Sequence, residues 1–251
     1  MTEILSEFGF RRDGRTADQV RNATVRFNCY PNADGSVYWE QGNTKVLCAV
    51  YGPHEPRQRG RTLEDRSFVN CLFSTALFSG TEQRKRQRGD RRSHDNERLI
   101  ENAMESVIVT TLYPRSQIDI YLEILTMDGS TLATCFNAAA LAVADAGIAL
   151  KGMPAAVCVG FSEDQGCIDL CGREENANSP RLTIGALVES ESMVLMNLEN
   201  CMHQDNIEKM LDSAMHGAVQ ISGLMRTALM SHVRGAFDRV ERAFAAPAVV
   251  S

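Results

Sequence analysis

The sequence predicts an α+β fold in which mixed β-sheets are covered by helices on their outer faces. Runs of alternating apolar and polar residues, typical of half-buried strands, are interrupted by segments with helical periodicity. The expected order is four strands, a helix, a strand, a helix, four strands and a final helix, so each half has strands followed by helical cover. The 251 residues are 44% hydrophobic, which allows a sizeable core and excludes a disordered chain. Because no linker-like segment separates the halves, we expect a single domain over residues 1–251.

Four strands are expected first, at residues 24–29, 36–39, 44–51 and 68–73. The Asn-Ala-Asp-Gly stretch at 32–35 is a turn signal between two of them, and we expect the four to form an antiparallel meander. Two polar segments without apolar periodicity, 52–66 and 79–92, are predicted to be loops.

The next helix is predicted over residues 93–113, because its apolar residues share one stripe, Ser93 can cap it and Pro114 stops it. A strand follows at 118–124, and a turn at 128–130 leads into a helix over 131–146 that Gly147 closes. Strands are then expected at 155–162, 166–170, 182–188 and 193–198. A long amphipathic helix at 204–233 ends the fold, and 245–251 is expected to fray.

The net charge of −6 and the isoelectric point near 5.5 argue at first sight against a nucleic-acid partner. The average hides a split, because residues 1–116 carry 18 Lys+Arg against 15 Asp+Glu, whereas residues 117–251 carry 8 against 17. Of the 26 cations, 22 are arginine. Guanidinium is the fork-shaped donor suited to phosphate.

A basic segment over residues 84–92 holds six cations in nine residues, and five of the six are arginine. A solvated surface loop is the ordinary interpretation of such a run. Phosphate binding is favoured here because Arg91 and Arg92 adjoin a predicted helix N-terminus, where backbone N–H groups attract anions. We therefore place a nucleic-acid contact ahead of a solvated loop.

Two further segments could carry chemistry. The turn from Asp128 to Thr131 joins a strand to a helix and could cradle a phosphate, although a Ser or Thr there is more often only a cap. Asp169, Glu174 and Glu175 could hold a divalent ion or act as a general acid, and an exposed acidic turn is the alternative. Asp169 follows Ile168 at a strand end, where burial could raise its pKa.

No segment has the roughly 20 apolar residues of a membrane span, and the N-terminus lacks a basic region followed by an apolar one. Most of the eight cysteines lie in apolar runs, which favours reduced, buried thiols in an intracellular compartment. Cys167 and Cys171 are a poor zinc half-site, so no metal is assigned.

The chain resembles the ribonuclease PH family, and within it the ring subunits of the RNA exosome. The resemblance covers about residues 8–233 and depends on several ordered motifs: RDGR at 12–15, EQGNTKV at 40–46, GPHEP at 52–56, YPRSQIDI at 113–120, DG at 128–129 and NAAALAVADAG at 137–147. It implies a ribonuclease PH-like fold with a duplicated βαβα-type unit, a six-membered ring, and RNA threaded through a central channel.

The same resemblance assigns roles to individual residues. Arg91 and Arg92 match paired basic residues that contact RNA, and Arg61 and Arg66 lie in the insert that lines the narrow part of the channel. Asp169 matches the catalytic acid and Glu175 a second acidic residue, usually Asp.

Active members of the family hold inorganic phosphate with Gly, then Ser or Thr, then Arg. The matching residues here are Ser130, Thr131 and Leu132. Thr131 is retained, but the glycine and the arginine are replaced. Since leucine cannot bind a multiply charged phosphate, the resemblance implies a degenerate phosphate site.

The first hypothesis is a non-catalytic exosome ring subunit that guides single-stranded RNA to an associated hydrolytic nuclease. Its implied partners are other ribonuclease PH-like subunits in a hetero-hexameric ring and RNA-binding cap subunits, with no membrane. We expect it in the nucleus, including the nucleolus, and in the cytoplasm. The alternative is an active phosphate-dependent 3′-to-5′ exoribonuclease, with inorganic phosphate and Mg²⁺ required only in that case. A hydrolytic metal site built from Asp169, Glu174 and Glu175 is the third hypothesis.

Overall fold

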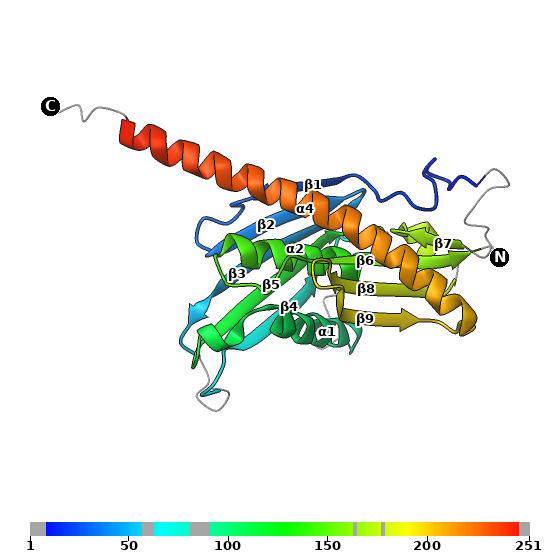
Figure 1. The fold of residues 1–251 in the computed structure, drawn as a ribbon, viewed down its shortest axis with the longest axis horizontal. Helices are drawn as coiled ribbons and strands as arrows, with labels where there is room; N and C mark the ends of the chain where they lie inside the picture. The colour runs from blue at the N-terminus through cyan, green and yellow to red at the C-terminus, as the bar shows by residue number, and fades with distance from the viewer. Residues whose placement is uncertain (1–8, 57–62, 81–90, 163–164, 177–178, 246–251) are drawn as a thin grey trace.

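Two β-sheets and four α-helices form the described part of the chain (Figure 1). The computed structural model describes residues 9–56, 63–80, 91–162, 165–176 and 179–245. One sheet has five strands in the order β1-β2-β3-β5-β4, and the other has four in the order β7-β6-β8-β9. The predicted α+β architecture is confirmed.

The five-stranded sheet begins with an antiparallel meander and continues with strands that cross over. Strand β5 pairs antiparallel with β3, and β4 lies at the edge, parallel to β5. The predicted four-strand meander is therefore wrong for its last strand. A parallel pair needs a long crossover, and the chain supplies one through helix α1 between β4 and β5. The bounds are β1 Ala23–Phe27, β2 Gly35–Gln41, β3 Thr44–His54, β4 Phe68–Thr75 and β5 Gln117–Thr126.

The four-stranded sheet is antiparallel throughout. Its strands agree with the predicted ones except at residues 166–170, where the strand ends earlier. Asp169 has a φ of +59°, which turns the chain out of the sheet. The bounds are β6 Pro154–Ser162, β7 Gln165–Ile168, β8 Arg181–Leu187 and β9 Ser192–Glu199.

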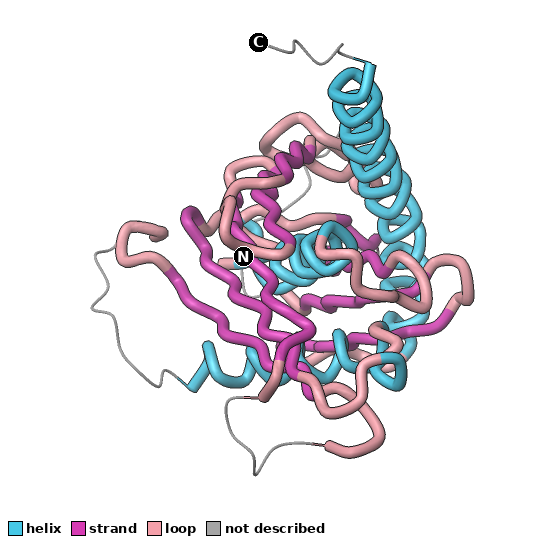
Figure 2. The backbone as a smooth tube through the Cα atoms, turned by 90° about the vertical axis from the view of Figure 1, so that its left-hand side faces the viewer, coloured by secondary structure: helices cyan, strands magenta, loops and turns pink. Residues whose placement is uncertain are grey.

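Helix α2 (Thr131–Asp145) lies between the two sheets, against β2 and β3 on one side and β6 on the other (Figure 2). The predicted position of helices on the outer faces of the sheets does not describe this helix, because it lies between them. Twelve of its 15 residues are buried, as expected of a helix that is apolar on all sides. Its approach to β2 is so close that a Cβ on Gly35 would lie 2.2 Å from the Ala142 carbonyl oxygen.

Helix α1 (Arg91–Val107) begins before the predicted cap Ser93 and ends before the predicted limit at 113. It ends there because Ile108 forms a β-bridge with Leu150, after which a 3₁₀ turn, η2 (Thr110–Leu112), continues the chain. α1 runs antiparallel to β4, since Phe73 N–H donates to Glu97 near the start of α1 and Ser67 N–H donates to the Thr110 carbonyl beyond its end.

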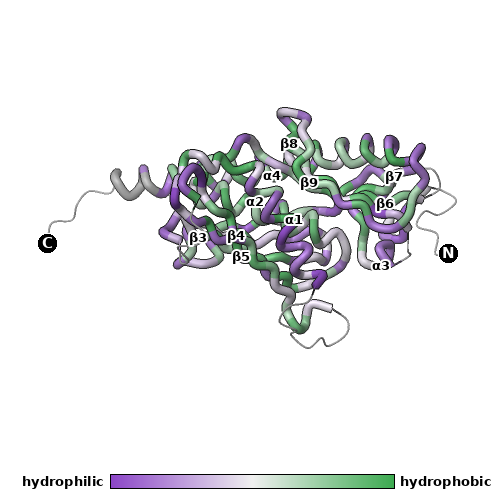
Figure 3. Tube along the Cα trace, turned by 90° about the horizontal axis from the view of Figure 1, so that it is seen from below, coloured by the Kyte–Doolittle hydropathy of each residue, from purple (hydrophilic) through white to green (hydrophobic). Residues whose placement is uncertain are grey.

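Helix α4 (Asp205–Ala245) covers the outer face of the second sheet and extends beyond the body of the molecule (Figure 1). Where Figure 3 leaves α4 in view, its turns alternate between hydrophobic and hydrophilic residues. It runs further than the predicted end at 233, and its extension leaves Phe237 exposed. Within the described chain, no helix is both long and apolar enough to cross a bilayer.

The core is a single set of contacting buried residues that spans both sheets and α2. Trp39, Phe136 and Leu141 are fully buried in it. This shared core fixes the position of the β5–α2 turn relative to the loop after β7. Those two segments hold most of the chemistry-bearing residues that the sequence singles out.

Candidate functional site

The turn after β5 meets the loop that follows β7 and the short helix α3 (Gly172–Glu175). The Asp128 carboxylate accepts a hydrogen bond from Gly172 N–H at 3.1 Å, and the Ser130 hydroxyl donates to the Leu170 carbonyl at 3.0 Å. Gly129 has a φ of +80°, and a Cβ there would lie 2.4 Å from the Leu170 carbonyl oxygen. The predicted phosphate turn and the predicted acidic segment therefore form one site.

Asp169 is a buried partner of Arg21, with 1% of its surface exposed. Its Oδ2 accepts from the backbone N–H and the Nε of Arg21, both at 2.9 Å, and its Oδ1 accepts from Nη2 at 2.7 Å. Burial raises the pKa of Asp169, but the hydrogen bonds and charge of Arg21 outweigh burial and hold the pKa below its usual value. The expectation of a raised pKa at Asp169 is wrong, because the sequence did not reveal Arg21 as its partner.

Glu174 is paired in the same way with another arginine of the N-terminal segment. Arg11 donates from Nε to its Oε1 at 2.8 Å, and both side chains are buried. Burial raises the pKa of Glu174, yet the bonds from Arg11 lower it below the usual value. Asp169 and Glu174 are thus neutralised by separate arginines, and the described residues contain no group of three His, Cys, Asp or Glu able to hold a metal ion. The geometry gives the hydrolytic metal site no support.

Glu175 differs from its two neighbours because its carboxylate reaches the phosphate turn. Its Oε1 accepts from Ser130 N–H at 2.7 Å, and its Oε2 lies 3.6 Å from Nη1 of Arg181. Burial raises the pKa of Glu175, and the Ser130 N–H and Arg181 offset this only in part. Among the three acidic residues, the raised pKa belongs to Glu175.

The first turn of α2 has no charged side chain. Ser130 occupies the N-cap position in a left-handed conformation, with a φ of +51°, and its side chain makes no cap hydrogen bond. Thr131 is half-buried. Leu132 is 9% exposed and belongs to the hydrophobic core. The position that would need an arginine to clamp a phosphate is used for packing instead.

The described arginines among those predicted to contact RNA lie near both ends of α1 rather than in one cluster. Arg91 and Arg92 are exposed in its first turn, whereas Arg66 lies 3.9 Å from Glu105 near its other end. At 1.5 Å per residue, these ends are about 20 Å apart. Arg61 and the basic residues from 84 to 88 lie outside the described residues.

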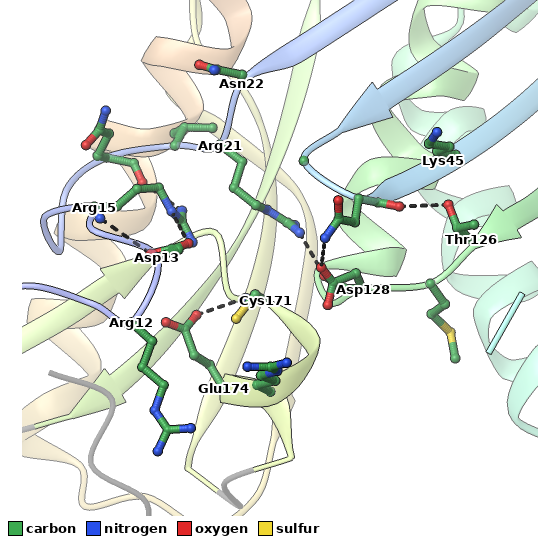
Figure 4. Close-up of a pocket in the computed structure, with 16 residues that line it drawn as sticks. Arg12, Asp13, Arg15, Arg21, Asn22, Lys45, Thr126, Asp128, Cys171 and Glu174 are labelled. Atoms are coloured by element: carbon green, nitrogen blue, oxygen red, sulfur yellow. Dashed lines mark hydrogen bonds and ion pairs between the residues drawn. The ribbon is translucent and has the colours of Figure 1, made fainter. Parts of the chain in front are cut away.

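Asp128 also lines an open cleft of about 900 Å³ (Figure 4). Arg21 lies between this cleft and the buried Asp169, because its Nη1 also donates to the Asp128 carbonyl at 2.7 Å. Asn43 holds the Asp128 side chain from the β2–β3 turn at 2.9 Å. The cleft lining includes four further cations, Arg12, Arg15, Lys45 and Arg173.

Sequence reasoning missed Arg11, Arg21 and Arg181 as site residues. Arg21 is 148 positions from Asp169, and Arg11 is 163 positions from Glu174. No local pattern signals pairs this distant. The RDGR motif marked the N-terminal segment, but it did not indicate which carboxylates the arginines would meet.

The two-sheet fold, with its strand–turn–helix junction opposite an acidic segment, agrees with the family models that match the chain. The model described as "3' exoribonuclease family, domain 1" matches residues 19–149, and that described as "3' exoribonuclease family, domain 2" matches residues 152–217. The chain belongs to this family, the RNase PH family, and the resemblance in the sequence is confirmed.

Relatives match over most of their length. The chain is 45% identical over 231 residues to the putative exosome complex component RRP41 of Caenorhabditis briggsae, covering 92% of this chain and 96% of the relative. It is 43% identical over 235 residues to the exosome complex component RRP41 of Homo sapiens, covering 93% and 96%.

Two solved structures share the fold. Rice Rrp46 matches with a TM-score of 0.78 at 24% identity, over 87% of this chain and all of that one. The Archaeoglobus fulgidus exosome with RNA bound to the active site matches with a TM-score of 0.72 at 18% identity, over 85% and 92%. These likenesses confirm the ribonuclease PH-like fold.

Proposed function

We propose that this chain is a subunit of the RNA exosome core ring, where it binds single-stranded RNA and guides it to an associated nuclease without phosphorolytic activity of its own. The relatives named RRP41 support the ring assignment. The absence of phosphorolytic activity is inferred from one observation: Leu132 is packed in the core at the position where the phosphate site needs an arginine.

The size of that defect follows from electrostatics. Phosphorolysis uses a multiply charged phosphate as the attacking group, and a guanidinium both binds it and offsets charge in the transition state. Losing one such contact costs roughly 3 kcal/mol, about a hundredfold in rate. Leu132 offers no hydrogen bond, and Ser130 directs its hydroxyl to the Leu170 carbonyl.

RNA binding is assigned to the arginines along α1. Arg91 and Arg92 place two positive charges in the first turn of α1, which holds no acidic residue and where the helix dipole disfavours cations. A bound RNA phosphate removes that conflict. Together with Arg66 and Arg61, they would follow the RNA backbone without reading bases.

The partners of this role are other ribonuclease PH-like subunits in a hetero-hexameric ring, RNA-binding cap subunits and a hydrolytic nuclease. The places where it acts are the nucleus, the nucleolus and the cytoplasm. These finer assignments follow from the ring role and are part of the proposal.

The alternative function is a phosphate-dependent 3′-to-5′ exoribonuclease that releases nucleoside diphosphates. One observation favours it: Glu175, beside the phosphate turn, has a raised pKa of the kind a general acid needs. In that case Thr131 would help hold phosphate, while Asp169 would support the site through Arg21.

A product assay separates the two functions. The chain is assembled with its ring partners and incubated with 3′-tailed RNA, with either phosphate or Mg²⁺ alone. The proposed function predicts intact RNA in both reactions. Nucleoside diphosphates that appear only with phosphate would establish the alternative, and nucleoside monophosphates with Mg²⁺ alone would point to hydrolysis.

Binding is tested separately by charge reversal. The Arg91→Glu, Arg92→Glu double variant should bind RNA more weakly, with a smaller dependence of the affinity on salt. The matched control is Arg234→Glu with Arg239→Glu, an equal charge change on the exposed extension of α4. Equal RNA affinity for wild type and the α1 variant would refute the assignment.

A further inference from the structure

We propose that Glu175 is a built-in anion that occupies the phosphate position at the start of α2, and that Arg181 is the cation a phosphate would meet there once Glu175 is removed. The inference rests on the proposed function, since it gives a second cause for the absence of phosphorolysis. It concerns residue 175 and is independent of the packing of Leu132.

The contact between Glu175 and Ser130 has the geometry of an anion at a helix N-terminus. The first N–H groups of a helix have no partner within it and carry partial positive charge. The Ser130 N–H, at the N-cap of the 15-residue helix α2, donates to Glu175 Oε1 at 2.7 Å. The chain thus supplies its own carboxylate at the place where an external anion would bind.

The second oxygen of the carboxylate faces a guanidinium. Arg181, at the start of β8, lies 3.6 Å from Glu175 Oε2 and donates through Nε to Glu199 at 2.8 Å. Glu199 keeps Arg181 next to the site when residue 175 changes. A phosphate in place of the carboxylate would lie between one backbone N–H and one guanidinium, a pair suited to an oxyanion.

The length of the side chain decides whether the carboxylate reaches the turn. Glu175 lies at the end of α3, and its carboxylate spans the gap from that helix to the N-terminus of α2. An aspartate is one methylene shorter, so it would withdraw the carboxylate from the Ser130 N–H. The extra methylene of glutamate is therefore what closes the site.

The contact also has an electrostatic cost. Burial raises the pKa of Glu175 despite the Ser130 N–H and Arg181, so the carboxylate is held in surroundings that disfavour its charge. The Glu199 carboxylate adds to the rise. An internal anion needs no translational entropy to bind, which lets it exclude free phosphate in spite of this cost.

The test measures phosphate binding to the full-length chain by equilibrium dialysis with radiolabelled inorganic phosphate. Glu175→Ala should bind phosphate at least tenfold more tightly than wild type, and Glu175→Asp should show a smaller gain. Glu175→Gln, which keeps an oxygen near Ser130, should gain least. Adding Arg181→Gln to Glu175→Ala should remove the gain.

Glu189→Ala is the matched control, because Glu189 follows the end of β8 opposite to Arg181 and pairs with Arg226 at the surface, and it should gain no phosphate binding. Circular dichroism verifies that each variant is folded. Folded Glu175→Ala and Glu175→Asp variants that bind no more phosphate than wild type would overturn the inference, as would a gain that survives Arg181→Gln. The product assay on the wild-type ring decides the proposed function separately, because nucleoside diphosphates there would refute it whatever the dialysis shows.

Discussion

The pair formed by Arg21 and Asp169 should make a large contribution to stability, and Arg21→Met tests it. The variant keeps an unbranched side chain of similar length but removes the guanidinium. Asp169 then stays buried as an uncompensated carboxylate, with 2% of its side chain exposed. We expect the free energy of unfolding to fall by about 4 kcal/mol, because breaking a buried ion pair from one side costs about 3–5 kcal/mol.

The structure accounts for that magnitude. Arg21 donates three hydrogen bonds to Asp169 through its backbone N–H, Nε and Nη2, and the variant loses two of them. It also loses the donor to the Asp128 carbonyl at 2.7 Å, which connects Arg21 to the turn before α2. In a chain of this size, a loss of about 4 kcal/mol lowers the melting temperature by roughly 8–16 °C.

Urea unfolding followed by the fluorescence of Trp39, the single and fully buried tryptophan, measures the change. Combining Arg21→Met with Asp169→Leu removes both charges. The decrease in the free energy of unfolding should then be smaller, by at least about 2 kcal/mol, than the sum of the decreases in the two single variants. A cost below about 1 kcal/mol for Arg21→Met, or additive single changes, would refute the role of the pair.

The pH dependence of the same pair has a definite sign. The pKa of Asp169 is lower in the folded chain than in the unfolded chain. The ionised carboxylate therefore stabilises the fold above the pKa of the unfolded chain, and this stabilisation is lost as the pH falls through the pKa of the folded chain. The stability difference between wild type and Arg21→Met should therefore shrink on acidification below the usual pKa of aspartate. A difference that stays constant there would contradict an ionised Asp169 in the folded chain.

Three further outcomes are expected. Gly129→Ala should destabilise the chain by roughly 2–4 kcal/mol in urea unfolding, because its Cβ would lie 2.4 Å from the Leu170 carbonyl oxygen at a φ of +80°. Glu175→Gln should become more stable relative to wild type as the pH rises above 4.5, because the raised pKa of Glu175 means that its ionisation disfavours the folded state. If the free energies of unfolding of the two proteins change in parallel with pH, this expectation is contradicted. Arg66→Ala should change stability by less than about 0.5 kcal/mol, because its pair with Glu105 is exposed, yet weaken RNA binding in a filter assay.

The sequence predicted most elements because their periodicity is local. Alternation predicted the strands of both sheets, and the turn at 128–130 with the closing Gly147 predicted α2 as a helix. The place of α2 between the sheets, and the edge position of β4 beyond β5, could not be derived from local pattern. Both are decided by which apolar faces meet in the shared core, and that depends on pairings between distant segments.

The site was predictable where it depends on contiguous residues. The turn from Asp128 to Thr131 and the acidic segment up to Glu175 were both singled out, and the structure brings them together. The protonation states were not predictable, because they depend on arginines far away in the sequence. Asp169, beside Arg21, has a lowered pKa, and Glu175, beside Arg181 and the Ser130 N–H, has a raised one because burial outweighs those two contacts.

The excess of arginine over lysine has one physical cause that the fold shows and a second that we propose. Arg11 and Arg21 are buried, and each uses its planar fork to bond a buried carboxylate and nearby backbone carbonyls. A lysine has three donors on a single point charge, so it cannot satisfy that many acceptors in two directions. Arg91 and Arg92 are exposed in the first turn of α1, where the helix dipole disfavours cations and where we propose that they bind phosphate. The same residue type therefore holds the acidic turn in place and, we infer, binds RNA outside it, so the arginine content alone would overstate the size of the RNA-binding surface.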